Sequence, residues 1–286
     1  MAIVLGPNRY GKAETRLVRV FRDDDTHRLA DLNVSIALSG DLAATHLTGD
    51  NAGVLPTDTM KNTVYAFAKE YGVGEPEEFG LLLAMHFVAG QPQVRAAKVA
   101  IEAYDWERLG PHSFRRRADF VRTADVTVTV DQQQVVSGLR DLVLLNSTAS
   151  EFHGFPRDKY TTLPETNDRI LATAVDAKWR FLRTDIDWYE SFNATVEALT
   201  GAFVNTYSYS LQQTLFSMGS RVLETRPEIA EVRLALPNRH HYPVDLSPFD
   251  LTNDNEVFLA GDRPYGLIEG TVARDDAPEA HAEWYL

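Results

Sequence analysis

The chain contains no cysteine among its 286 residues. This absence excludes disulfide bonds, catalysis by a thiolate and metal sites built on thiolate ligands. Long hydrophobic runs are missing too, because residues 81–85 form one of the longest and a bilayer span needs about 20 residues. The first residues, 1–9, also lack the basic, apolar and small-residue succession of a signal peptide. We therefore expect a soluble intracellular protein that does not bind membranes.

Positive charge is scarce. Lys and Arg number 28 against 41 Asp and Glu, for a formal net charge of -13. A general nucleic-acid-binding protein needs a surplus of cations to neutralise phosphates, so this class is excluded. An acidic surface still permits an anionic small ligand, because a few cations in a concave, partly dry site dominate the local field.

The sequence has enough apolar residues for a sizeable core, with 44% hydrophobic and 24% charged residues. Such proportions are typical of globular proteins, and the length suits one large or two ordinary domains. Apolar residues three or four positions apart predict helices, and alternating ones predict strands. The predicted helices cover residues 57–71, 77–88, 165–175, 189–205 and 207–223. The predicted strands cover residues 17–21, 32–38, 94–104, 126–130, 142–145, 179–186, 231–236 and 266–274.

Strand pairs around helix pairs thus occur twice, which predicts an α+β protein built from two similar halves. A faint echo agrees with this: residues 55–58 and 163–166 both contain Leu-Pro, and each is predicted to open a helix. We place the division near residues 131–137, where glutamines interrupt the strand pattern, which gives domains 1–134 and 135–286. No linker rich in Gly, Pro or Ser separates them, so we expect the halves to pack together.

Residues 6–12 have the glycine and lysine spacing of a phosphate-binding loop. Such a loop also needs Ser or Thr after the lysine and a helix behind it. Here Ala13 follows Lys12, and the next segment alternates like a strand, so the nucleotide interpretation fails. Lys12 itself remains a candidate functional residue, with an ordinary surface lysine as the alternative.

The helix start at Thr57 and Asp58 has two interpretations. Thr57, Asp58 or Thr59 can cap the helix, and Asp58 suits the positive end of its dipole. Alternatively, a hydroxyl and free backbone amides at a helix start can hold a polar or anionic ligand. Spacing alone favours the cap.

Residues 151–169 are dense in aromatic, charged and turn-forming residues. One interpretation is a structured loop with an aromatic plug. The other is a binding surface in which Phe152 stacks on a planar ring and Arg169 contacts adjacent acceptors with its guanidinium fork. Both stay open from composition alone.

Three further segments carry polar residues of interest. Gln212 lies in a predicted helix, where a solvent-facing side chain is ordinary. His240 and His241 invite a metal site, but no metal-type spacing such as HExxH occurs, and we favour Asn238 and His240 as a proton-handling pair on one strand face. Residues 115–117 are three arginines, which we interpret as a solvated turn.

Taken together, these segments are similar to the urate oxidase (uricase) family over nearly the whole chain. Any one of them is weak evidence, but their order and separations are specific. The resemblance rests on residues 10–12, 57–65, 151–169, 211–214, 236–240 and 262–269.

The resemblance implies two tandem tunnelling-fold (T-fold) domains, each an antiparallel sheet backed by helices. Dimers would close barrels that stack into a homotetramer, with active sites shared between chains. Urate, O2 and water would become 5-hydroxyisourate and hydrogen peroxide, with neither a metal nor an organic cofactor.

The resemblance also implies a role for individual residues. Phe152 would stack on the purine, Arg169 and Gln212 would clamp its polar edge, Leu211 would give a backbone contact, and Leu163 would line the pocket.

The remaining implied residues serve oxygen and protons. Thr57 and Asp58 would reach in from the neighbouring chain. Asn238 and the partner's Thr57 would hold oxygen or water above the ring. Lys12, Thr57 and His240 would form the proton relay.

The chain departs from the family in two places. Residues 281–286 lack the Ser-Lys-Leu type of tail that directs eukaryotic members to peroxisomes, which implies a bacterial-type, cytoplasmic enzyme. His153 stands where some members have a tryptophan, and it is therefore not assigned a catalytic role.

Two other function classes compete with an oxidase. A pterin- or purine-processing cyclohydrolase of the same fold would need zinc, and the lack of cysteine weighs against it. A non-catalytic purine-binding scaffold would not need Lys12, Thr57 and His240 together.

Overall fold

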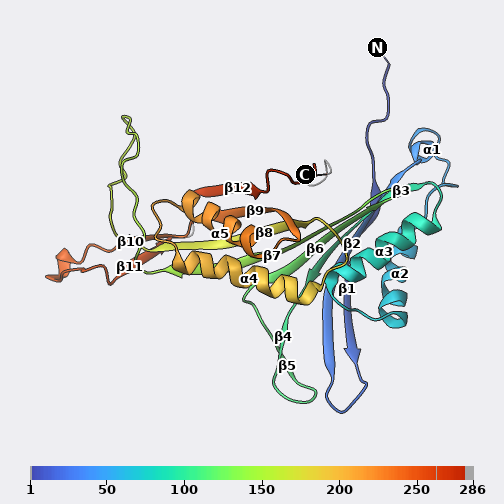
Figure 1. Ribbon diagram of the computed structural model, residues 1–286, viewed down its shortest axis with the longest axis horizontal. Coiled ribbons are helices and arrows are strands. Elements are labelled where there is room, and N and C mark those ends of the chain that lie inside the picture. The colour runs from blue at the N-terminus through green and yellow to red at the C-terminus, as the bar shows by residue number, and fades with distance from the viewer. Residues whose placement is uncertain (1, 262, 281–286) are drawn as a thin grey trace. The chain divides into compact units, whose positions relative to one another are not determined.

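The computed structural model describes residues 2–261 and 263–280. The chain divides into two compact units (Figure 1). Unit 1 comprises the residues up to 138 together with 183–190, and unit 2 comprises residues 139–182 and those from 191 onward. Each unit combines sheet and helix, so the predicted α+β class with antiparallel sheets backed by helices is confirmed.

Unit 1 contains a sheet in the order β1-β2-β3-β6, followed by the first part of β7. Neighbours from β1 to β6 pair antiparallel. Helix α2 packs against β1, and α3 packs against β3 and β6. The strands are β1 (Tyr10–Phe21), β2 (Arg28–Gly40), β3 (Val94–Ala103), β4 (Trp106–Arg108), β5 (Phe114–Arg116), β6 (Val121–Thr129) and β7 (Gln133–Asn146), and the helices are α1 (Ala43–Leu47), α2 (Thr57–Glu70) and α3 (Pro76–Gly90).

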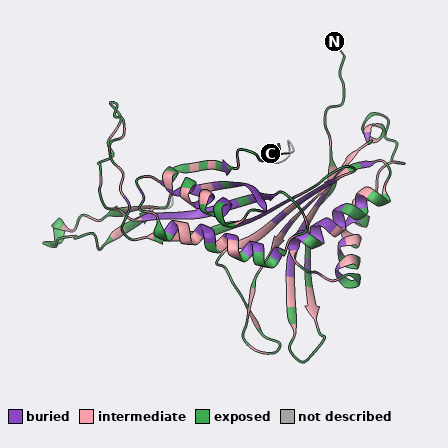
Figure 2. Ribbon diagram, viewed as in Figure 1, coloured by how far each residue is buried: buried purple, intermediate pink, exposed green. Residues whose placement is uncertain are grey.

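Alternation along the strands explains why the helices cover one face of this sheet (Figure 2). Val34, Ile36 and Leu38 of β2 are buried, whereas the residues between them are half-buried. Helix α2 places Met60, Val64 and Ala68 on one buried side at a spacing of one turn. Apolar strand faces and helix faces therefore meet in the core of unit 1.

Unit 2 follows the same plan, with the second part of β7 beside β8, β9 and β12. Helix α5 packs against β9 and β12, and Trp179 of β8 contacts Phe192 of α4. Its strands are β8 (Leu171–Phe181), β9 (Ile229–Pro237), β10 (His240–Pro243), β11 (Phe258–Gly261) and β12 (Leu267–Ala273), and its helices are α4 (Trp188–Asn205), α5 (Leu211–Thr225) and the short η1 (Ser247–Phe249). No helix in the described part of the chain is long and apolar enough to cross a membrane.

One predicted helix is wrong. Residues 165–170 form no helix, and β8 starts at Leu171. All five residues from Leu171 to Val175 are buried, so the strand shows none of the alternation that identifies a half-buried strand. The same strand ends at Phe181, short of the predicted 186. The predicted helices at 57–71, 77–88 and 189–205 are confirmed within one or two residues at most ends.

Other boundaries need smaller corrections. Helix α5 begins at Leu211 and not at residue 207, because the Ser210 side chain accepts a hydrogen bond from the Gln213 amide and caps it there. The predicted interruption is shorter than the glutamine run: Gln132 lies in the break between β6 and β7, whereas Gln133 and Gln134 already belong to β7. Residues 115–117 are no simple turn: Arg115 and Arg116 lie in β5 and pair with Glu107 and Asp31.

The close contact of β1 and β2 at Gly11 generates a prediction. A Cβ atom at Gly11 would lie 1.8 Å from the Ile36 carbonyl oxygen, whereas one at Gly6 would meet nothing within 4 Å. We expect Gly11→Ala to lower the free energy of unfolding by about 1–3 kcal/mol, because the strands must separate. Urea denaturation of this variant beside Gly6→Ala measures the difference. Equal stability of the two variants would contradict this steric account.

Candidate functional site

Of the predicted site residues, Lys12, Thr57 and Asp58 belong to unit 1 and the others to unit 2. Lys12 is half-buried in β1, directly before a bulge in the pairing with β2. Within the bulge, Glu14 has a φ of 57° and its amide donates to the Ser35 hydroxyl at 2.9 Å. Such a bulge bends the strand and redirects neighbouring side chains.

The start of α2 corrects the capping interpretation. The N-cap residue is Pro56, and no side chain caps the helix. Thr57 is the first helical residue and is half-buried, while Asp58 is exposed. The Asp58 carboxylate instead accepts hydrogen bonds from Lys61 and Asn62. The side chains of Thr57 and Asp58 therefore do not cap the helix.

The charges around Asp58 link this helix to Lys12. The pKa of Asp58 is lowered, first by the hydrogen bonds from Lys61 and Asn62 and then by the charge of Lys61, with a smaller contribution from the charge of Lys12. Lys12 thus lies close enough to the beginning of α2 to act on it electrostatically. Lys12 and Asp58 of unit 1 are therefore within electrostatic range of each other.

In unit 2, two aromatic rings and two guanidinium groups form a cluster at Phe152, called here the aromatic stack. The Phe155 ring lies 4.9 Å from the Phe152 ring at an interplanar angle of 17°. The Arg169 Cζ atom lies 5.2 Å from the centre of Phe152, and the Arg157 Cζ atom lies 5.3 Å from that of Phe155. Phe155 covers one face of Phe152, so a planar ligand can stack only on the other face, next to the Arg169 guanidinium.

Backbone pairing fixes the stack. Phe152 and Thr166 exchange two hydrogen bonds of 2.8 and 3.1 Å, and the Arg169 amide donates to the Ser150 carbonyl at 2.9 Å. Burial lowers the pKa of Arg169, although a guanidinium stays charged at any ordinary pH. A partly buried cation beside an aromatic face is suited to a flat anion, which would compensate the lost hydration.

The same pairing reaches the start of α5. Ser150 forms a bridge with Ser208, and the Glu151 amide donates to the Ser208 carbonyl at 2.9 Å. Two residues further on, Ser210 caps the helix that begins with buried Leu211 and exposed Gln212. The structure therefore ties the segments of Phe152, Arg169, Leu211 and Gln212 to one another.

Asn238 also joins this region, whereas His240 stands on a separate hairpin. Asn238 bridges Thr173 at the beginning of β8, and the Asn238 amide donates to the Gly266 carbonyl at 2.8 Å. Strand β9 ends at Pro237 and β10 starts at His240, so the assumption that Asn238 and His240 share one strand is wrong. His240 opens β10 and stacks on Tyr242 with ring centres 5.7 Å apart.

Leu163 lies in the loop between Phe152 and Arg169, and its side chain is 51% exposed. Its backbone carbonyl accepts a long hydrogen bond of 3.5 Å from Arg157. An exposed leucine on a loop next to the aromatic stack is available to cover a ligand.

Sequence reasoning missed several residues that contact the predicted site. Phe155 supports Phe152, and the Glu151 carboxylate joins the Tyr207 hydroxyl and the His153 ring, each at 2.9 Å. Glu151 raises the pKa of Tyr207, chiefly through this hydrogen bond. The aromatic density of residues 151–169 was the available signal for Phe155, but nothing in the sequence marks Ser150. Among the described residues, no group of three or more His, Asp or Glu is placed to hold a metal ion.

The hydrogen bonds on Asp58 generate a second prediction. Lys61→Met is expected to raise the pKa of Asp58, because it removes the largest cause of its lowered value. A lowered carboxyl pKa stabilises the fold above the unfolded-state pKa, and this stabilisation disappears as pH falls through the folded-state value. Carboxyl NMR titration measures the change. Lys69→Met, at the other end of α2, serves as the control and should leave the Asp58 pKa unaltered.

Comparison with known proteins places this geometry in a family context. A profile described as Uricase matches residues 8–132 and 135–269. The chain is 49% identical to the uricase of Arthrobacter globiformis over 284 residues, which cover 99% of this chain and 94% of that protein. It is 39% identical to the uricase of Dictyostelium discoideum over 277 residues, 93% of this chain and 96% of the other.

Solved structures agree. The crystal structure of uricase from Arthrobacter globiformis superposes with a TM-score of 0.97 at 49% identity and covers 100% of both chains. A uricase from Bacillus fastidious, only 22% identical, shares the fold with a TM-score of 0.82 over 96% of each chain. The matched residues include all the predicted site residues. Two parts of the sequence used for the resemblance and the localisation, Asp262 and residues 281–286, lie outside the described part of the chain. The chain belongs to the uricase family.

Proposed function

We propose that this protein is a urate oxidase that converts urate, O2 and water into 5-hydroxyisourate and hydrogen peroxide, with neither a metal nor an organic cofactor. The observation that carries the proposal is the partly buried Arg169 guanidinium over the Phe152 ring, in a chain of the uricase family. This pair offers one flat apolar surface and one fork of donors, which suit a planar purine anion.

In this proposal the substrate lies on the face of Phe152 that Phe155 leaves open. Arg169 and Gln212 donate to the polar edge of the purine, and the Leu211 backbone adds a further contact. Leu163 covers the pocket from the loop. The connected backbone pairing of these segments supports the assignment, because a purine clamp needs its arms held at a fixed spacing.

Oxidation removes two electrons and two protons from urate, and O2 takes up both to become hydrogen peroxide. Water then supplies the hydroxyl group of the product. Urate is electron-rich enough to reduce oxygen itself once further deprotonated, so the residues of the chain have to position the reactants and move protons. Lys12, Thr57 and His240 form the relay, and Asn238 and Thr57 hold oxygen or water above the ring.

We further propose that Thr57 and Asp58 reach the purine from a neighbouring copy, in a homotetramer whose T-fold sheets close into barrels. The edge strands support this assembly: β1 ends the sheet of unit 1 and β12 ends that of unit 2, so each has backbone groups available for another copy. The neighbouring-chain role is also consistent with the availability of Thr57 and Asp58 at an uncapped helix start. We also propose that the protein is a bacterial-type member of the family that acts in the cytoplasm.

The test of this function is a mass balance. Chelator-treated protein is mixed with urate while urate loss, oxygen uptake and peroxide formation are recorded together. We expect equal molar amounts of all three. Dependence on added zinc would instead indicate a cyclohydrolase-like enzyme, and binding of urate without turnover would indicate a scaffold. Either result would refute the proposal.

The proton relay has its own prediction. Lys12→Met is expected to slow turnover by about 100-fold, the lower range of general acid–base catalysis, while urate binding without oxygen stays within about twofold. Stopped-flow turnover and anaerobic titration measure the two quantities.

Lys98→Met is the matched control for Lys12→Met. Lys98 is also half-buried in the sheet of unit 1. It occupies the row of Gly11 and Ala37, whereas Lys12 occupies the next row with Ile36 and Val99. Alternate rows point to opposite faces, so Lys98→Met should leave turnover intact. Weakened binding with normal turnover in Lys12→Met would exclude Lys12 from the relay.

A further inference from the structure

The guanidinium of Arg169 is held at one of its three nitrogens. Its Nε donates to the Ser150 hydroxyl at 3.3 Å. In the described part of the chain, the two terminal nitrogens donate to no other residue, and no carboxylate pairs with them. Two donors of the fork thus remain available while the third is occupied.

Ser150 is itself unusually well fixed. It is fully buried, its carbonyl accepts from the Arg169 amide at 2.9 Å, and its backbone bridges Ser208. Arg169 therefore contacts the same residue through both its backbone and its side chain. Because Ser150 is buried and its backbone is held by hydrogen bonds, its hydroxyl has a fixed position beside the Arg169 guanidinium.

The partner strand of Ser150 leads directly to the other arm of the clamp. Ser208 is fully buried, accepts a hydrogen bond from the Thr214 hydroxyl at 2.8 Å, and donates to the Ser210 carbonyl at 3.1 Å. Ser210 caps α5, whose second residue is Gln212. The backbone bridge from Ser150 to Ser208 and the hydrogen bonds of the Ser208 hydroxyl thus connect the anchor of Arg169 to the helix turn that carries Gln212.

We infer that Ser150 is a positioning residue for Arg169, and that its hydroxyl fixes the plane of the guanidinium so that both terminal nitrogens face the purine edge. This inference rests on the proposed function. The guanidinium is planar, so a bond to Nε sets the direction of the remaining donors. Without the hydrogen bond to Ser150, Arg169 keeps its charge and its place near Phe152. Its guanidinium can then rotate about the terminal side-chain bonds, and the bidentate contact with the purine is lost.

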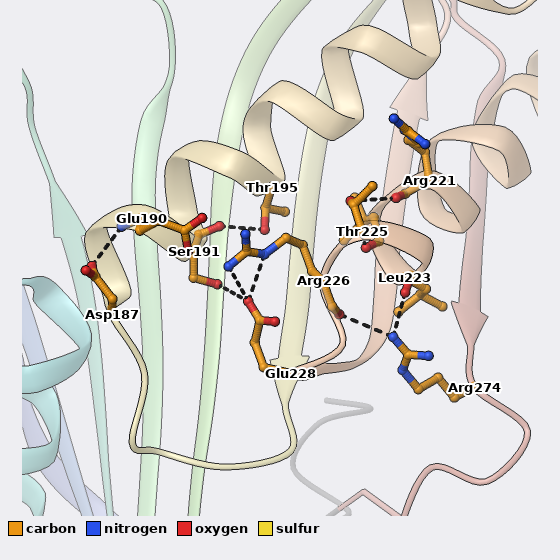
Figure 3. Close-up of polar contacts among 11 residues, drawn as sticks. Asp187, Glu190, Ser191, Thr195, Arg221, Leu223, Thr225, Arg226, Glu228 and Arg274 are labelled. Atoms are coloured by element: carbon orange, nitrogen blue, oxygen red, sulfur yellow. Dashed lines mark hydrogen bonds and ion pairs between the residues drawn. The ribbon is translucent and has the colours of Figure 1, made fainter.

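The first experiment compares Ser150→Ala with Ser191→Ala. Ser191 is equally buried, and its hydroxyl donates to Glu228 at 2.8 Å near the start of α4 (Figure 3). Both variants lose one buried hydroxyl, but only Ser150 contacts Arg169. We expect Ser150→Ala to raise the KM for urate and the anaerobic dissociation constant by about tenfold, with kcat within about twofold. Ser191→Ala should leave both constants unchanged. Equal constants for wild type and Ser150→Ala would overturn the inference, as would equal losses in both serine variants.

A double-mutant cycle separates positioning from a purely structural effect. In an Arg169→Lys background there is no guanidinium plane to orient, so Ser150→Ala should produce no further loss of affinity. A loss that adds fully to that of Arg169→Lys would show that Ser150 acts elsewhere, and the inference would fail. Ser150→Thr, which retains the hydroxyl, should restore affinity. Ser150→Cys preserves the volume with a weak acceptor, so it replaces Ser150→Ala if the alanine variant does not fold.

The wild-type measurements separate failure of the proposed function from failure of the inferred role of Ser150. Wild-type protein that neither binds nor consumes urate would refute the proposed function and this inference with it. Wild-type turnover together with unaltered affinity in Ser150→Ala and Ser150→Cys would refute the inference alone.

Discussion

Burial of one apolar face of each sheet by its helices is the constraint on which the other features depend. In unit 1 this requirement lays α2 on β1, and in unit 2 it lays α5 on β9 and β12. Thr57 is the first residue of α2 and Leu211 the first residue of α5, so the packing of these helices also sets where the two residues lie. A packed helix cannot shift its first turn without exposing its core face. The polar residues of that turn are therefore held in place by the packing, although nothing in the sequence distinguishes them.

Arg169 differs from Arg122 and Arg226 in how its charge is compensated. In unit 1, Arg122 pairs with buried Glu77, whose pKa burial raises, and in unit 2 Arg226 pairs with Glu228 (Figure 3). These carboxylates balance their guanidinium partners inside the fold, as buried charges require. Arg169 has a hydroxyl and an aromatic face instead, although the chain carries a net charge of -13. Arg274 also lacks a carboxylate partner but donates to three backbone carbonyls, whereas the two terminal nitrogens of Arg169 remain available for the proposed anionic substrate.

The periodicity of the sequence predicted the elements whose burial is one-sided. Helix α2 shows Met60, Val64 and Ala68 at regular spacing, and β2 alternates visibly. Strand β8 defeated the same reasoning because its first five residues are all buried, and the short hairpins β4–β5 and β10–β11 carry too few buried residues to leave a pattern. At the candidate site, Phe152 and Arg169 could be predicted from the sequence, because they provide an aromatic ring and a guanidinium in a segment rich in aromatic and charged residues. Ser150 was not, because its importance comes from pairing with Ser208, which lies 58 residues away in number but adjacent in the fold.

Gly11 explains a resemblance that was misleading in the sequence. The glycine spacing of residues 6–12 imitates a phosphate cradle, yet in the fold Gly11 faces Ala37 across β1 and β2, where the Ile36 carbonyl leaves no room for a Cβ atom. Strand sterics alone thus account for a glycine at this position. A short motif can arise from the chain's own crowding, and whoever scans genomes for nucleotide-binding loops should ask whether a strand follows before counting such a match.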